Sequence, residues 1–224
     1  MGMTPYEKEW LWLQKVQRTW SPEYKTFDPA KHPRGEGGRF GEGGTIETVS
    51  KTRESVILAE ESTIRYQTYE TAVIVDDKGD VVIKKVGDTN SVTFTSDEKK
   101  LMEGHTLTHT HPSSCSFSSQ DILMAQILNL REMRAVSGKY TYSIKPSGDK
   151  WPNIFFSALD YQYGQWTSDA YRSLDSELRS EFEEKLSNKI MTIDDANKTH
   201  HHELNLRLAR RFNLIYTREE LSHG

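Results

Sequence analysis

Cysteine is almost absent from this sequence, which contains one, Cys115, among 224 residues. A single thiol excludes an internal disulfide and is typical of proteins kept in a reducing compartment. It also argues against a structural zinc site, because such sites are usually closed by several cysteines. We interpret Cys115 as a filler residue in its loop, with a transient metal ligand or a redox group as the alternatives.

Long apolar runs and an excess of positive charge are also missing. No stretch approaches the ~20 apolar residues of a membrane-spanning helix. Acidic residues stand near the N-terminus, where a secretion signal would be apolar. The formal net charge of −4 argues against nucleic acid as the main partner. We therefore expect a cytoplasmic protein with no membrane partner and no secretion signal.

Glycine and proline are concentrated in residues 27–44, a composition that predicts a linker rather than a folded element. Apolar residues at helical spacing over residues 4–20 predict a short amphipathic helix before it. The remaining sequence has the alternation and spacing of folded elements. We divide the chain into an N-terminal helix with its linker (1–44), a core (45–150) and a helical C-terminal extension (151–224).

Strands and helices are both expected in the core, which indicates the α/β class. Two β-rich runs around a turn at residues 76–80 predict a hairpin over residues 69–88. Residues 46–66 fit either a helix or a strand. Alternation predicts further strands at 91–95, 105–111 and 139–146, and capping residues with apolar spacing predict helices at 98–103 and 118–134.

The C-terminal extension is expected to be helical. Residues 157–191 are polar, helical and aromatic, and a last helix covers about residues 199–213. That helix begins with three consecutive histidines, 200–202, followed by Glu203. Consecutive histidines splay around a helix axis, so they predict a solvated helix start rather than a second metal site. His201 or His202 would contact a substrate if this helix packed near the site.

The most informative stretch is HTHPSSCSFSSQD, residues 109–121. Residues two apart on a strand point to the same face, so His109 and His111 can share one metal ion. Pro112 ends the strand, a serine-rich loop brings the chain back, and Asp121 falls in the first turn of the next helix. Two imidazoles and one carboxylate leave a fourth position open for water, which is typical of catalytic zinc sites.

A purely structural interpretation fits the same residues. Ser118 and Asp121 are spaced almost as in a helix capping box, and histidines two apart are common on strands. What favours a metal site is the combination, in this order, of strand, His-x-His-Pro, short loop, Ser-x-x-Asp and helix.

This combination resembles the metal signature of the JAB/MPN family, the JAMM zinc metalloproteases, and most closely that of its bacterial and phage members. The resemblance covers about residues 66–146. It implies a cytidine-deaminase-like JAB/MPN domain, with a mixed, mostly antiparallel sheet flanked by helices. The sequence departs from the pattern in its loop, because six residues separate His111 from Ser118 and deubiquitinase-type members usually have seven.

The resemblance also implies roles for individual residues. Ser118 would hydrogen-bond the oxyanion that forms during hydrolysis. The family's general base is a glutamate on an early strand, and we assign it to Glu70, which starts the run YETAVIV. The implied Zn²⁺ ligands are His109, His111 and Asp121. The alternatives for the base are Glu61 and Glu60, with Glu54 less favoured.

The activity implied is that of a zinc-dependent protease or isopeptidase, which hydrolyses an amide or isopeptide bond through a metal-activated water. Its substrate would be a protein or peptide, such as a ubiquitin-like conjugate or a phage structural protein. The alternative is a non-catalytic MPN-type scaffold that binds partners. A nucleobase deaminase is disfavoured, because its Pro-Cys-x-x-Cys pair is absent, and the acidic balance disfavours a nuclease.

One segment of the linker suggests a biological setting. KHPRGEGGRF, residues 31–40, resembles a short segment of phage head-associated proteins. The resemblance suggests a phage or prophage protein that acts in the cytoplasm of the bacterial host or is associated with the virion.

Overall fold

The computed structural model describes residues 52–154 and 169–221, which belong to one compact unit that starts at Ser50. The predicted N-terminal helix and linker, and part of the segment 157–191, lie outside the described residues. In chain order the described elements are α2 (Arg53–Ile64), β1 (Thr71–Val75), β2 (Val81–Val86), α3 (Ser96–Met102), β3 (Thr106–Thr110), α4 (Ser119–Ile127), β4 (Glu132–Val136), β5 (Tyr140–Pro146), α6 (Asp169–Ser187), α7 (Ile193–Phe212) and β6 (Leu214–Glu220).

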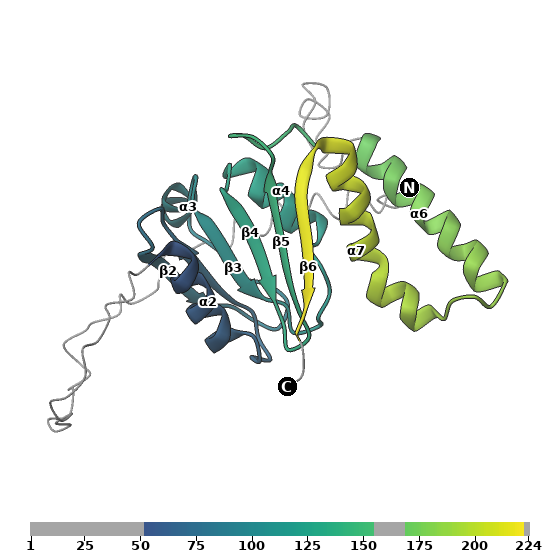
Figure 1. The fold of residues 1–224 in the computed structure, drawn as a ribbon, viewed down its shortest axis with the longest axis horizontal. Helices are drawn as coiled ribbons and strands as arrows, with labels where there is room; N and C mark the ends of the chain where they lie inside the picture. The colour runs from purple at the N-terminus through teal and green to yellow at the C-terminus, as the bar shows by residue number, and fades with distance from the viewer. Residues whose placement is uncertain (1–51, 155–168, 222–224) are drawn as a thin grey trace, which may run out of the picture. The chain divides into compact units, whose positions relative to one another are not determined.

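A six-stranded sheet in the order β2-β1-β3-β4-β5-β6 organises these elements (Figure 1). Strands β3 and β4 run parallel, and every other neighbouring pair is antiparallel. The prediction of a mixed, mostly antiparallel sheet flanked by helices is therefore confirmed. Among the described residues, no helix combines the length and the apolar character needed to span a membrane.

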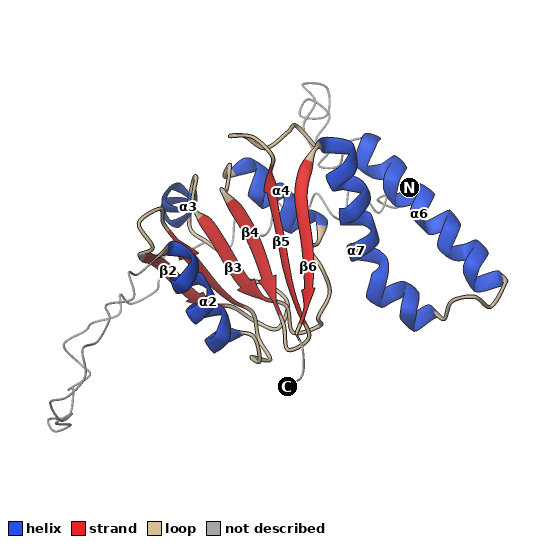
Figure 2. Cartoon of the chain, in the orientation of Figure 1, coloured by secondary structure: helices blue, strands red, loops and turns tan. Residues whose placement is uncertain are grey.

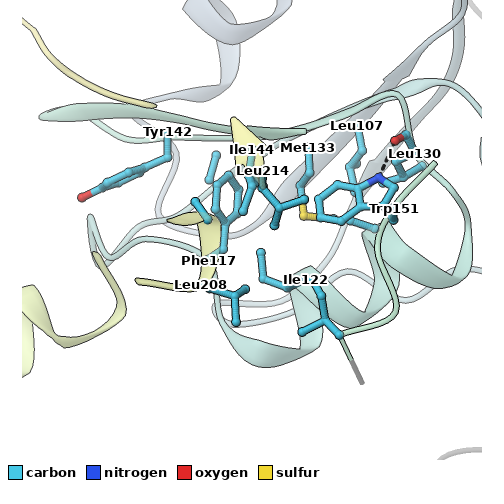
Figure 3. Packing of buried hydrophobic residues seen from close by; sticks show 14 of the residues in the cluster. Leu107, Phe117, Ile122, Leu130, Met133, Tyr142, Ile144, Trp151, Leu208 and Leu214 are labelled. Carbon is cyan, nitrogen blue, oxygen red and sulfur yellow. Dashed lines mark hydrogen bonds between the residues drawn. The ribbon is translucent and has the colours of Figure 1, made fainter. Parts of the chain in front are cut away.

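Helices pack on both faces of the sheet (Figure 2). On one face, which we call the α2 face, Ile57 and Ile64 of α2 pack against β1 and β4. On the other, the α4 face, residues of α4, α6 and α7 form the larger core. Figure 3 shows Phe117 and Leu208 in that core, together with Trp151, whose indole N–H donates to the Leu130 carbonyl at 2.6 Å. Because strand residues alternate between the faces, each functional side chain belongs to one of these two environments.

The helix predicted over residues 118–134 is wrong in its second half. Helix α4 ends at Ile127, Asn129 takes a left-handed φ of 44°, and residues 132–136 form strand β4. All five residues of β4 are buried. Its sequence, EMRAV, alternates polar and apolar residues, but Glu, Met, Arg and Ala also favour helices, so the segment was mistaken for a continued helix.

Other predictions have mixed outcomes. Residues 46–66, left open between helix and strand, contain α2, and the hairpin over 69–88 is confirmed as β1 and β2. The short strand predicted at 91–95 is wrong, because these residues form a loop. There the Asp88 carboxylate accepts the N–H groups of residues 90 and 91, and Phe94 is buried by packing without any strand pairing.

The C-terminal extension is not wholly helical. Residues 214–220 form β6, an edge strand paired antiparallel to β5, although only helices were expected after residue 150. Asn213, with a left-handed φ of 54°, caps α7 and reverses the chain. The strand was missed because, in its sequence LIYTREE, only the first residue is buried and most of the others are exposed, so no pattern of apolar residues marks it.

Candidate metal centre

The two histidines are placed by strand β3, whose five residues are all buried in the middle of the sheet. His109 lies on the strand, and His111 follows its end while still donating its N–H to the Val136 carbonyl at 2.8 Å. Both side chains therefore lie on the α4 face, as predicted from their spacing. Their Nε2 atoms are 2.8 Å apart.

Asp121 reaches the histidines from the first turn of α4. Its Oδ1 lies 3.7 Å from His109 Nε2, and its Oδ2 lies 3.7 Å from His111 Nε2. The same Oδ2 accepts hydrogen bonds from the Ser118 N–H and hydroxyl, both at 2.8 Å. Asp121 N–H donates in return to Ser118 Oγ at 3.2 Å. The capping box and the histidine–carboxylate cluster are therefore both present, and the cap aims the carboxylate at the imidazoles.

The donor set and its spacing fit a metal ion. One ligand atom from each of His109, His111 and Asp121 lies within 4.8 Å of the others. Two imidazole nitrogens bound tetrahedrally to one zinc would be separated by about 3.3 Å, close to the 2.8 Å observed. His111 Nδ1 lies 2.8 Å from the Cys115 carbonyl, which leaves Nε2 free of its proton for a metal. Cys115 thus orients His111 through its backbone carbonyl. The side chains of His109, His111 and Asp121 could hold a metal ion.

The electrostatics of the cluster favour a cation at neutral pH. Burial lowers the pKa of His109 to about 4; His111 lowers it further, whereas Asp121 opposes the shift. Burial favours the neutral form of Asp121, but His109, His111 and two hydrogen bonds from Ser118 hold its pKa below the usual value. His109 is therefore neutral and Asp121 ionised at neutral pH, which are the states that bind metals.

Glu70 lies beside this cluster on the same face of the sheet. Ala72 pairs with His109, so the register of β1 and β3, continued by two residues, sets Glu70 opposite His111. Hydrogen bonds of the Glu70 main chain to residues 87 and 88 extend the hairpin and fix this position. Burial raises the pKa of Glu70 to about 7; His111 opposes the shift, while Asp121 and Asp88 add to it.

The alternative glutamates lie elsewhere. Glu61 is fully buried on the α2 face, where it accepts from Thr108 Oγ1 at 3.0 Å and from Arg134 Nε at 2.6 Å. Thr108 precedes His109 on β3, so their side chains point to opposite faces. Glu60 pairs with Lys84 at 2.6 Å, and a Glu54 oxygen lies 3.7 Å from Arg134 Nη1. Of the four glutamates considered from the sequence, the structure brings Glu70 alone to the histidines.

Sequence reasoning missed the side chains that hold the loop between the ligands, residues 112–118. Asn205 of α7 donates to the Phe117 carbonyl at 2.8 Å, and Tyr216 of β6 bonds Ser116 Oγ at 2.7 Å. His202 Nδ1 lies 2.7 Å from the same Tyr216 hydroxyl. These residues stand about 90 positions away from the motif, and no local pattern connects them to it.

The histidine segment of α7 is only partly solvated. His202 is directed to Tyr216, and His200 lies 2.9 Å from Asp175 of α6. Burial lowers the pKa of His201; His200 and His111 lower it further, whereas Asp121 and Asp175 oppose the shift. The prediction of a solvated helix start is therefore wrong, because α7 begins at Ile193, the three histidines lie within it, and His202 is buried.

Comparison with known proteins adds no relative to these observations. No family model matches the chain, and neither a curated protein nor a solved structure matches it. The function must therefore be inferred from the site itself.

Proposed function

We propose that this protein is a zinc-dependent metallopeptidase of the JAMM type, which hydrolyses an amide or isopeptide bond. The proposal rests on one observation above all. His109, His111 and Asp121 converge at the end of a buried strand, and a glutamate of raised pKa stands beside them on the same face of the sheet. Perturbed carboxylates beside a potential metal site are typical of hydrolytic centres.

Each residue has a role that follows from its position. When bound, zinc would lower the pKa of a water molecule and polarise the scissile carbonyl. Glu70 takes the proton of the attacking water and delivers it to the leaving amine. A base whose pKa lies near the working pH performs both transfers well. The Ser118 hydroxyl, which donates to Asp121 in the structure, would turn from that bond to donate to the developing oxyanion, an effect worth roughly 3–4 kcal/mol in other proteases.

The wider setting is also part of the proposal. The order of strand, loop and helix around the cluster, and the six-stranded mixed sheet, support a cytidine-deaminase-like JAB/MPN fold. We propose a protein or peptide substrate, either a ubiquitin-like conjugate or a phage structural protein. The linker motif supports a phage or prophage origin, with action in the host cytoplasm or on the virion.

The first experiment is to measure metal content by mass spectrometry after chelation and reloading with zinc. We expect about one zinc per chain in the wild type, and its loss in His109→Ala and in Asp121→Asn. The asparagine variant keeps an oxygen for the Ser118 cap and removes the charge, so it separates cap from ligand. His105→Ala, four residues earlier in the sequence and outside the cluster, is the matched control and should keep its zinc.

Hydrolysis is tested next on zinc-loaded protein, with isopeptide-linked diubiquitin and a linear peptide library as probes. Glu70→Ala should retain zinc and lose cleavage by at least about 100-fold, as expected for a general base. Glu61→Gln should retain both functions, because Glu61 lies on the other face. Activity that survives in Glu70→Ala would overturn the assignment of the base.

The scaffold alternative is favoured by one observation, the complete capping box of Ser118 and Asp121, which satisfies both residues without any ion. Under that alternative, well-folded wild-type protein would take up no zinc. The metal measurement therefore separates the two functions.

A further inference from the structure

The loop between the ligands, residues 112–118, is held in a conformation that its own sequence does not favour. Ser114 has a left-handed φ of 58°, a region that serine rarely occupies and that must be stabilised by its surroundings. The Tyr142 hydroxyl donates to the Ser114 carbonyl at 3.1 Å. Because the loop joins His111 to Asp121, its conformation sets the distance between two of the three ligands.

Two elements from the end of the chain hold the other half of this loop. Asn205 Nδ2 donates to the Phe117 carbonyl at 2.8 Å and to Ser116 Oγ at 3.2 Å. The Tyr216 hydroxyl bonds the same Ser116 Oγ at 2.7 Å. Asn205 and Ser116 are each only 2% exposed, so water cannot replace a bond that is lost.

The orientation of Tyr216 is itself determined. Its hydroxyl lies 2.7 Å from His202 Nδ1, and its ring packs edge-on against Phe117 with centroids 6.4 Å apart. The chain from His202 through Tyr216 to Ser116 is therefore continuous, and it ends two residues before the cap that aims Asp121. No group in this chain belongs to the metal cluster.

We infer that Asn205 and Tyr216 are positioning residues of the metal centre, and that α7 and β6 belong to the functional site. The inference rests on the proposed function for the identity of the ion. Ligands that are already in place when the ion arrives lose less conformational freedom on binding, so the metal is held more tightly. Removing either side chain frees the loop without removing a ligand.

The test compares zinc affinity in three variants of the full chain, measured by competition with a chromogenic chelator. Asn205→Ala and Tyr216→Phe should weaken zinc binding by about 10- to 100-fold, as loss of a group that orients ligands does elsewhere. Trp151→Phe is the matched control, because it removes a buried hydrogen bond of the same core, to Leu130, away from the loop (Figure 3). It should lower stability and leave zinc affinity unchanged.

A second measurement needs no metal. Amide hydrogen exchange at residues 113–118 of the apo protein should accelerate by at least about 10-fold in Tyr216→Phe and stay unchanged in Trp151→Phe. Wild-type zinc affinity and wild-type loop exchange in Tyr216→Phe would overturn the inference. Wild-type protein that binds no zinc would overturn the proposed function instead, while loop exchange would still report whether Tyr216 holds the loop.

Discussion

At the scale of single residues, the clearest contrast is between two glutamates that the sequence could not separate. Glu61 is buried but fully partnered, because Arg134 and Thr108 satisfy its carboxylate. Glu70 is half-buried, and burial, together with the negative charges of Asp121 and Asp88, raises its pKa, which His111 opposes. The Glu61 carboxylate therefore has a structural role, whereas the raised pKa of Glu70 suits a group that exchanges protons.

This difference predicts an unusual pH dependence for Glu70. Its pKa is raised from 4.5 to about 7 in the folded protein. The folded state therefore holds a proton that the unfolded state releases, and stability is lost as pH rises through this window. In metal-free protein, Glu70→Gln should be more stable than the wild type at about pH 8, with the gain shrinking toward about pH 5.

Urea denaturation at several pH values checks this expectation. Glu60→Gln is the control, because Glu60 is also partly buried but its carboxylate is paired with Lys84, and it should show no such gain. Equal stability of Glu70→Gln and the wild type at the higher pH would contradict the prediction.

At the scale of elements, the α2 face carries a buried ionic cluster that ties α2 to the sheet. Arg134 of β4 donates to Glu61 of α2 through Nε and Nη2, and to Glu132 through Nη1 at 3.1 Å. Glu132 also accepts from Ser143 of β5 at 2.6 Å. One helix and two strands are thereby joined through a single guanidinium.

Breaking this cluster should cost much stability and leave the metal centre intact. Glu61→Ala leaves Arg134 buried without its main partner, and we expect a loss of about 3–5 kcal/mol in the free energy of unfolding. Glu60→Ala, which breaks an exposed pair on the same helix, should cost about 0–1 kcal/mol. Denaturant unfolding measures both, and an equally small effect of the two variants would refute this account of α2.

At the scale of the whole molecule, the site is assembled from segments that are distant in the sequence. Strand β3 and helix α4 supply the ligands, the start of β1 supplies Glu70, and α7 with β6 holds the loop. Metal binding is therefore linked to folding of the entire described unit, because the cluster exists only when these elements have come together.

Zinc should accordingly stabilise the folded protein. At a free zinc concentration of 100 times the dissociation constant, the gain is about 2.7 kcal/mol. Thermal unfolding with and without zinc measures it. His109→Ala should show no shift, whereas Glu61→Gln, although less stable, should show the full shift. An unfolding temperature of the wild type that does not change when zinc is added would contradict this linkage.

Local patterns in the sequence were sufficient for much of the ligand cluster. Alternation over residues 105–111 predicted that two histidines share a face, and the Ser-x-x-Asp spacing predicted a carboxylate in the first helical turn. Both are determined by backbone geometry within about 13 residues, so no distant contact was needed to foresee them. The hairpin that follows Glu70 was predictable for the same reason.

Tertiary structure decided what depends on long-range pairing. The register of β1 against β3 places Glu70 on the same face of the sheet as the histidines. Glu61 of α2 contacts Thr108 on the opposite face. Strand β4 was taken for helix because its residues favour helices, and its pairing with β3 and β5 decides otherwise. Strand β6 was missed because most of its residues are exposed, and only pairing with β5 makes it a strand. Likewise, Asn205 and Tyr216 reach the loop across 88 and 100 residues, a proximity that chain folding alone creates.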